Sequence, residues 1–212
     1  MTAAHFSPSA DISLLEAEQY EQEAFQPIQH TADKLGITLR KIFRVTDNVE
    51  RELLGMAKRS HFDIVLVGSS RELFTDHKIS GKVGALIHQT NSIVGVFIDK
   101  GFKKINNALF VVTTSHDLFL LEYAKKFLEV NDKNHVTVWN MESLFTKDED
   151  LEQLMGKGFL PQTTFLAAAE ERKDVARNYD IVVVSFNFWM SLKRKQSSWL
   201  GQMPSALIID HA

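Results

Sequence analysis

Two glycine-containing turns around a short variable stretch are the best candidates for chemistry in this sequence. An apolar segment ends in Gly68-Ser69-Ser70-Arg71, and after nine further residues Gly81-Lys82 opens an amphipathic stretch. A glycine at a strand end lets backbone approach a phosphate, and free N–H groups at a helix start attract its charge. We therefore predict an anion-binding loop made of Gly68, Ser69, Ser70, Arg71, Gly81 and Lys82. The alternative is a strand-to-helix connection that serves folding alone.

A second run, Ser115-His116-Asp117, contains the three residue types of a hydrolytic triad. Adjacent side chains cannot line up as nucleophile, base and orienting acid, because a triad is defined by its spatial geometry. We interpret the run as a strand-to-helix turn capped by Ser115 or Asp117, and we assign no catalytic residue. The eight histidines show no pair at the close helical spacing of a metal site, which favours surface or capping roles over metal ligation.

The composition is that of a globular protein. The chain has 212 residues, of which 44% are apolar and 24% charged. It has no cysteine, which excludes disulfides, cysteine-ligated zinc and thiol nucleophiles. A net charge of −3 lacks the basic footprint of a nucleic-acid-binding protein. The sequence shows no signal peptide, and its longest apolar window, Ile181 to Leu192, is shorter than the roughly 20 residues of a membrane span. We expect a soluble, cytoplasmic protein.

One segment of the chain is repeated. The run Phe62 to Val67 reappears as Tyr179 to Val184, 117 residues later. Each copy follows a polar, helix-like stretch and precedes a second apolar segment that ends in aspartate, at Asp99 and Asp210. We interpret the sequence as two copies of one unit, residues 1–102 and 103–212.

Apolar runs separated by amphipathic segments indicate the fold class. The runs are nearly continuous, which is typical of parallel strands buried on both faces and covered by helices. We predict an α/β fold of two units, each with a mainly parallel, five-stranded sheet. The runs are 64–67, 111–112, 181–184 and 207–209.

The pattern also predicts the individual elements. In the first copy we expect a helix over 14–35 that is kinked by Pro27 and ended by Gly36, and then a strand over 37–45. Asp47 or Asn48 should cap the next helix. In the second copy we expect a strand over 108–113, a helix over 117–129, a strand over 135–139, a short helix or loop over 146–157, and a strand over 163–168 followed by a helix to 178.

The two copies differ at their beginnings. The second opens with a strand and a helix, residues 108–130, whereas the first begins at Thr2 to Phe6, which aligns with the second strand of the other copy at 136–139. We therefore expect the first unit to lack its opening strand and helix, and we interpret the chain as a piece of a longer protein.

With these features in place, the sequence resembles the universal stress protein family. ATP-binding members of that family carry Gly-x-x-Gly, nine residues, and Gly-Ser/Thr; here Gly68 and Gly81 take the first and last glycine positions. Arg71 stands where the middle glycine belongs and Lys82 where the hydroxyl residue belongs. In the second copy, the run 185–188 replaces the glycine turn. The resemblance is strongest at 37–99 and 108–139.

This resemblance implies a fold and a ligand class. The fold would be that of the adenine nucleotide alpha hydrolase-like proteins, with ATP, ADP or AMP as the candidate ligand at the degenerate loop. Thr113 and Thr114 would line the pocket of the second unit. The last strands of the units, 93–98 and 206–210, would pair as an internal pseudo-dimer, with a homodimer as the alternative.

Within the family, the arrangement is similar to the soluble tail of bacterial cation/proton antiporters. The segments that carry this likeness are 5–8, 20–27 and 96–102. The resemblance implies a non-enzymatic regulatory module attached to a membrane transport domain; the alternative is a free-standing, tandem stress protein that binds ATP or AMP.

We interpret the basic run Lys193-Arg194-Lys195 as a solvated helix face rather than a partner surface, because it is short.

Overall fold

The structure is a computed structural model that describes residues 1–7, 16–60, 62–69, 81–101, 104–145, 148–167, 175–195 and 197–210. The chain forms two compact units, Met1–Ser60 and His61–Ala212. The repeat boundary predicted between residues 102 and 103 lies inside the second unit. The reason is that the sheet of this unit contains strands from both predicted copies.

The first unit is a parallel strand pair with two helices. Strands β1 and β2 pair in parallel, with Thr2 opposite Arg40 at one end and Ser7 opposite Val45 at the other. A parallel pair needs a crossover connection, and a helix supplies it here. The elements are β1 (Thr2–Ser7), α1 (Ala17–Lys34), β2 (Arg40–Val45) and α2 (Val49–Arg59).

The helix ends in this unit follow the predicted signals. The helix α1 continues through Pro27 and ends before Gly36, whose φ of 65° is in the left-handed region that favours glycine. Of the two predicted caps of α2, Asn48 is the one: its side-chain oxygen accepts the Arg51 N–H at 2.9 Å.

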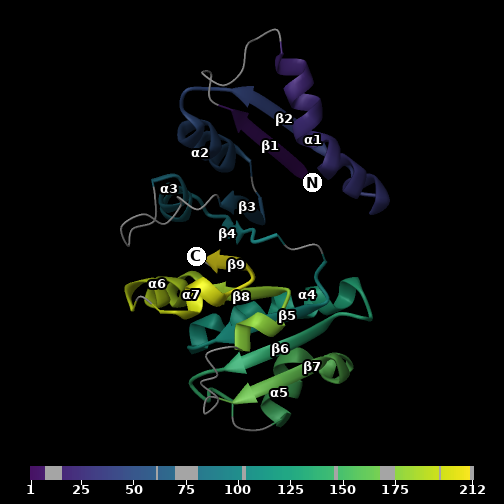
Figure 1. The fold of residues 1–212 in the computed structure, drawn as a ribbon, viewed down its shortest axis with the longest axis vertical. Helices are drawn as coiled ribbons and strands as arrows, with labels where there is room; N and C mark the ends of the chain where they lie inside the picture. The colour runs from purple at the N-terminus through teal and green to yellow at the C-terminus, as the bar shows by residue number, and fades with distance from the viewer. Residues whose placement is uncertain are drawn as a thin grey trace. The chain divides into compact units, whose positions relative to one another are not determined.

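The second unit is built on a seven-stranded sheet with the order β3-β4-β9-β8-β5-β6-β7 (Figure 1). All neighbours are parallel except β4 and β9. This confirms the predicted α/β class with a mostly parallel sheet flanked by helices. The strands are β3 (Ile64–Ser69), β4 (Ile93–Ile98), β5 (Asn107–Val112), β6 (His135–Asn140), β7 (Thr163–Ala167), β8 (Ile181–Ser185) and β9 (Ser205–Asp210).

Helices connect these strands. The α-helices are α3 (Gly81–Gln89), α4 (Leu120–Val130), α5 (Asp148–Met155), α6 (Phe186–Arg194) and α7 (Trp199–Gln202). The 3-10 helices are η2 (Ser115–Phe119), η3 (Lys157–Gln162) and η4 (Val175–Asn178). The helix expected to run to residue 178 falls partly on residues outside the described ranges.

The two segments at the ends of the predicted copies are hydrogen-bonded partners. Strand β4 pairs with β9 from Val94 opposite Asp210 to Ile98 opposite Ala206. The Lys100 side chain, directly after β4, donates to the carbonyls of Leu200 and Met203 at 3.1 and 2.8 Å. These bonds fix the antiparallel junction within one chain.

The faces of the sheet carry two apolar cores. One contains Val182, Val184 and the buried side chains of α6; the other contains Ile181, Val183 and the buried side chains of α4. Because successive strand residues point to opposite faces, β8 contributes to both cores and is buried along its whole length.

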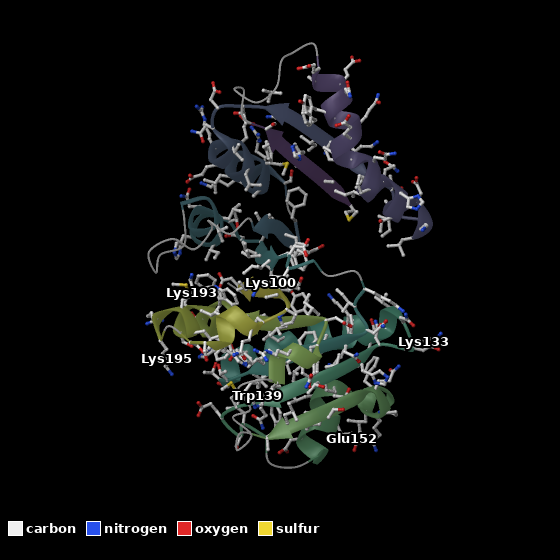
Figure 2. All side chains as sticks on the ribbon, viewed as in Figure 1. Lys100, Lys133, Trp139, Glu152, Lys193 and Lys195 are labelled. Carbon is white, nitrogen blue, oxygen red and sulfur yellow. The ribbon has the colours of Figure 1, made fainter. Side chains whose placement is uncertain are left out.

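In the basic run at the end of α6, Arg194 and Lys195 are exposed and Lys193 is half-buried. Trp189 and Trp199 are buried in the core under α6 and α7. Figure 2 labels Lys193 and Lys195 at the C-terminal end of α6. The apolar side of this helix is therefore used in packing, and its basic C-terminal end is the more exposed part.

The sequence prediction was wrong for residues 64–67. This run was expected to be buried on both faces, yet Ile64 is 40% and Leu66 60% exposed. The cause is the position of β3, which has one neighbouring strand, whereas β8, its counterpart in the repeat, lies between β9 and β5 under α4.

A carboxylate ties β5 to β8 where both strands begin. The side chain of Asp180 accepts the backbone N–H groups of Asn106 and Asn107 at 2.8 and 2.9 Å. Asp63 is the sequence counterpart of Asp180 and is exposed. Among the described residues, no hydrogen-bond or ion-pair partner of the Asp63 carboxylate is found.

We expect Asp180→Ala to lower the free energy of unfolding by about 1–3 kcal/mol, because two backbone N–H groups lose a charged acceptor. Chemical denaturation measures the change. Asp63→Ala is the matched control, and its effect should stay within about 0.5 kcal/mol. Equal losses in both variants would contradict this role for Asp180.

Candidate functional site

A cavity of about 330 Å³ lies at the carboxyl ends of the strands in the second unit. It lies where the chain order reverses: β5 leads to β6 and β7 on one side, and β8 leads to β9 on the other. Open α/β sheets bind ligands at such a switch point. The lining residues are His116, Asp117, Phe119, Ser185, Phe186, Asn187, Ile209 and Asp210.

Asp117 organises the turn after β5. Its Oδ2 atom accepts the backbone N–H of Thr113 at 2.9 Å, the Thr113 hydroxyl at 2.6 Å and the backbone N–H of Thr114 at 2.9 Å. The residue is only 3% exposed. The N-cap of η2 is Thr114, which was not one of the two predicted caps; Asp117 lies at the third helical position and its side chain accepts the N-cap N–H.

The charge of this carboxylate is stabilised by its donors. Burial alone would raise the pKa of Asp117, but hydrogen bonds from Ser185, the Thr113 hydroxyl and the N–H groups of Thr113 and Thr114 outweigh it and lower the pKa below its ordinary value of 3.8. Asp117 is therefore ionised at neutral pH.

Ser185 connects this turn to the next strand. It is the last residue of β8 and caps α6, where its Oγ accepts the Phe188 N–H at 3.3 Å. Its hydroxyl also bonds to Asp117. One buried hydroxyl thus fixes the start of α6 against the turn after β5.

Thr113 and Thr114, the predicted site residues of this unit, lie beside the cavity. Both N–H groups donate to Asp117, so the carboxylate takes the place that a phosphate would need in order to use them. Their ligand role stays a prediction, and any ligand would meet Asp117 first.

Sequence reasoning missed most of the cavity lining. Phe186, Asn187, Ile209 and Asp210 were not assigned to a site, although Phe186 and Asn187 are the first two residues after β8 and Asp210 ends β9. Their position in the sequence could have indicated the site, because each of these residues lies at the carboxyl end of an apolar run. His116 was interpreted only as part of a turn.

The predicted anion loop lies between β3 and α3. Gly68 and Ser69 are the last residues of β3, and Gly81 and Lys82 are the first of α3. Ser70 and Arg71 lie outside the described residues. The predicted strand and helix on either side of the loop are therefore present, and the anion-binding role of the loop itself stays a prediction.

Gly68 has room on its side-chain side. A Cβ atom added there would meet no atom within 4 Å, and the residue has no positive φ. Neither the backbone conformation nor the described neighbours require a glycine at this position.

Two further features are not found among the described residues. In the described ranges, no group of three or more His, Asp or Glu side chains could hold a metal ion. No helix among the described residues has the length and apolar character needed to cross a membrane.

Comparison with solved structures identifies the fold. A universal stress protein from Archaeoglobus fulgidus DSM 4304 has a TM-score of 0.52 at 12% identity, over 90% of this chain and 76% of that one. A functionally unknown protein from Pseudomonas aeruginosa PAO1 has a TM-score of 0.52 at 8% identity. The match covers 98% of this chain and 81% of that one. The chain thus shares the universal stress protein fold. No protein-family model and no curated protein matches the sequence.

The lowered pKa of Asp117 predicts a specific pH dependence. Its ionised form stabilises the folded state above pH 3.8, and this contribution is lost as the pH falls through the lower folded value. Asp117→Asn should cost about 1–3 kcal/mol at pH 7, and the difference from the parent should shrink below about pH 4. Urea denaturation at several pH values measures this. A difference that is constant from pH 7 to pH 2.5 would contradict the role of the carboxylate charge.

Proposed function

We propose that the chain is a non-enzymatic regulatory module that binds a small ligand at the carboxyl edge of its sheet. The observation that carries the proposal is the cavity at the reversal of strand order, with Asp117 and Ser185 held in place by buried hydrogen bonds. A site of this kind recognises a ligand by pre-formed polar groups. The likeness to a universal stress protein structure supports the same class of module.

The chemistry of the cavity defines what fits it. The ionised carboxylate of Asp117 and the side chain of Asp210 disfavour an anion, and the turn's backbone donors are already used. Phe119, Phe186 and Ile209 supply apolar surface. A neutral or cationic, hydrogen-bonding molecule with one apolar face matches these groups, whereas a polyphosphate does not.

An adenine nucleotide belongs at the other predicted site. The open space at Gly68 leaves room for a phosphate beside the end of β3, the start of α3 at Gly81 supplies backbone N–H groups, and the sequence has a lysine at position 82. This supports ATP, ADP or AMP binding at the loop as the second candidate function, that of a nucleotide-binding stress protein.

Regulation would follow from differential binding. A ligand that prefers one conformation of the module shifts its population, and an attached domain responds to the shift. The sequence likeness of 5–8, 20–27 and 96–102 to antiporter tails supports a cation/proton transport domain as the attached part and the cytoplasm as the location. The free-standing stress protein is the alternative.

The coding sequence ahead of Met1 distinguishes these two arrangements. Several apolar segments of about 20 residues each would support the transporter tail, because each could span a bilayer as a helix. A short upstream stretch that encodes only a strand and a helix would support the free-standing protein.

ATP, ADP or AMP at 100 times its dissociation constant should raise the free energy of unfolding by about 2.7 kcal/mol if the loop binds nucleotide. Thermal unfolding with each nucleotide measures this. The response should weaken in Lys82→Ala, which removes the cation, and in Gly68→Val, which fills the open space at the strand end.

Asn187→Ala is the matched control. Asn187 lines the cavity beside Asp117, so this variant should leave the nucleotide response unchanged. A flat response to all three nucleotides would remove the nucleotide hypothesis. It would leave the proposal for the second unit's cavity, whose ligand is not an anion.

A further inference from the structure

The buried charge of Asp117 has no cationic partner among the described residues. Its side chain accepts the Thr113 hydroxyl and the N–H groups of Thr113 and Thr114, and it also bonds to the Ser185 hydroxyl. All of these donors are neutral, and none of the ion pairs between described residues includes Asp117. A carboxylate as buried as this one is normally paired with a positive group. Its hydrogen bonds keep the group ionised, but they do not neutralise it.

This charge lies at the wall of the cavity, together with a second carboxylate. Ser185 lies opposite Ile209 in the pairing of β8 with β9, so Asp210 is the next residue along the same edge. Among the described lining residues there is no lysine or arginine, and the one histidine, His116, is exposed. A concave site lined by carboxylates concentrates cations and repels anions.

Aromatic side chains supply another part of the wall. Phe119 packs against the core that contains the buried side chains of α4, and Phe186 packs against the core that contains those of α6. The two rings therefore come from opposite faces of the sheet, and both line the cavity. An edge-to-face contact with Tyr123, at 6.3 Å between ring centroids, holds Phe119 further. The faces of aromatic rings attract cations and also bind apolar groups.

The size and the lining of the cavity favour an organic cation over a metal ion. A metal ion needs several oxygen or nitrogen ligands around one point. In the described part of the chain, no group of three or more His, Asp or Glu side chains could hold one. The cavity volume of about 330 Å³ lies within the range of small-molecule sites, roughly 300–1,000 Å³. The cavity thus has room for an apolar body as well as for a charged group.

The polar groups of the lining indicate which cationic head fits. Carboxylates only accept hydrogen bonds when ionised, and the Asn187 side chain adds an amide oxygen. The backbone N–H groups of Thr113 and Thr114 already donate to Asp117. A primary ammonium group carries three donors and no acceptor, so it complements this lining, whereas a quaternary ammonium group would leave the acceptors unpaired.

From these observations we propose that the cavity beside Asp117 binds a primary organic ammonium ion with a compact aromatic body. The ammonium group lies beside the carboxylates of Asp117 and Asp210, and the body lies against Phe119 and Phe186. This inference rests on the proposed ligand-binding function of the cavity and narrows its ligand to a cation. The bound cation supplies the positive charge that Asp117 lacks.

Three probes of the same shape test the role of charge. Phenethylamine, phenethyl alcohol and phenylacetate share a phenyl ring on a two-carbon chain and carry a positive, a neutral and a negative end at pH 7. Each is titrated into the full chain at constant ionic strength, and the NMR amide signals of Thr113, Thr114 and Asn187 report binding at the cavity. Phenethylamine should bind at least about tenfold more tightly than the other two, because a charge-assisted hydrogen bond adds to the contact of the ring.

Methylammonium tests the role of the aromatic body. It has the same head without the ring, and it should bind at least about tenfold more weakly than phenethylamine. Equal affinity of the two cations would contradict the part assigned to Phe119 and Phe186.

Two variants test the carboxylates. Asp210→Asn should lower the preference for phenethylamine over phenethyl alcohol by about tenfold, and Asp117→Asn should do the same wherever the NMR spectrum shows that the variant is folded. Asp150→Asn is the matched control, because Asp150 is an exposed carboxylate on α5 and is not among the lining residues. It should leave the preference unchanged.

The outcomes separate this inference from the function on which it rests. Equal affinity for phenethylamine and phenethyl alcohol at the cavity would overturn the cation and leave a small-ligand site in place. A preference for the amine that persists in both Asp210→Asn and Asp117→Asn would overturn the role of the carboxylates. Unchanged cavity signals with every probe would overturn both the inference and the proposed function of the cavity. No nucleotide enters the experiment, so its outcome is separate from that of the nucleotide test.

Discussion

The antiparallel pairing of β4 with β9 is the constraint on which the second unit depends. It joins strands that are about 110 residues apart into one sheet, and each of the two strands gains a second neighbour from it. Without it, β9 would have one neighbouring strand, as β3 does now. The Lys100 side chain and Ser205 hydroxyl add polar bonds at this junction. Strands β3 and β4 of the first predicted copy therefore belong to the same sheet as the strands of the second copy. For this reason the compact unit begins at residue 61 and not at the predicted repeat boundary.

The electrostatic character of the two candidate sites differs because of one side chain. In the second unit, Asp117 supplies the negative charge that the turn after β5 would otherwise seek from a ligand, and Ser185 completes its hydrogen bonds. At the end of β3, which belongs to the same compact unit, Gly68 has open space on its side-chain side. The two proposed ligands differ accordingly: an anion for the predicted loop that begins at Gly68, and a neutral or cationic molecule for the cavity beside Asp117.

Much of the fold could be predicted because its signals are local. Continuous apolar runs such as 181–184 indicated buried parallel strands, and Gly36 and Asn48 marked helix ends at the positions where they occur. The exposure of Leu66 could not be predicted from its own run, which is as apolar as that of Val183; burial depends on which elements lie next to a strand, and periodicity does not contain this information. The cavity was missed for a related reason. Asn187 and Asp210 have no distinguishing spacing, and only the strand order brings them to one edge.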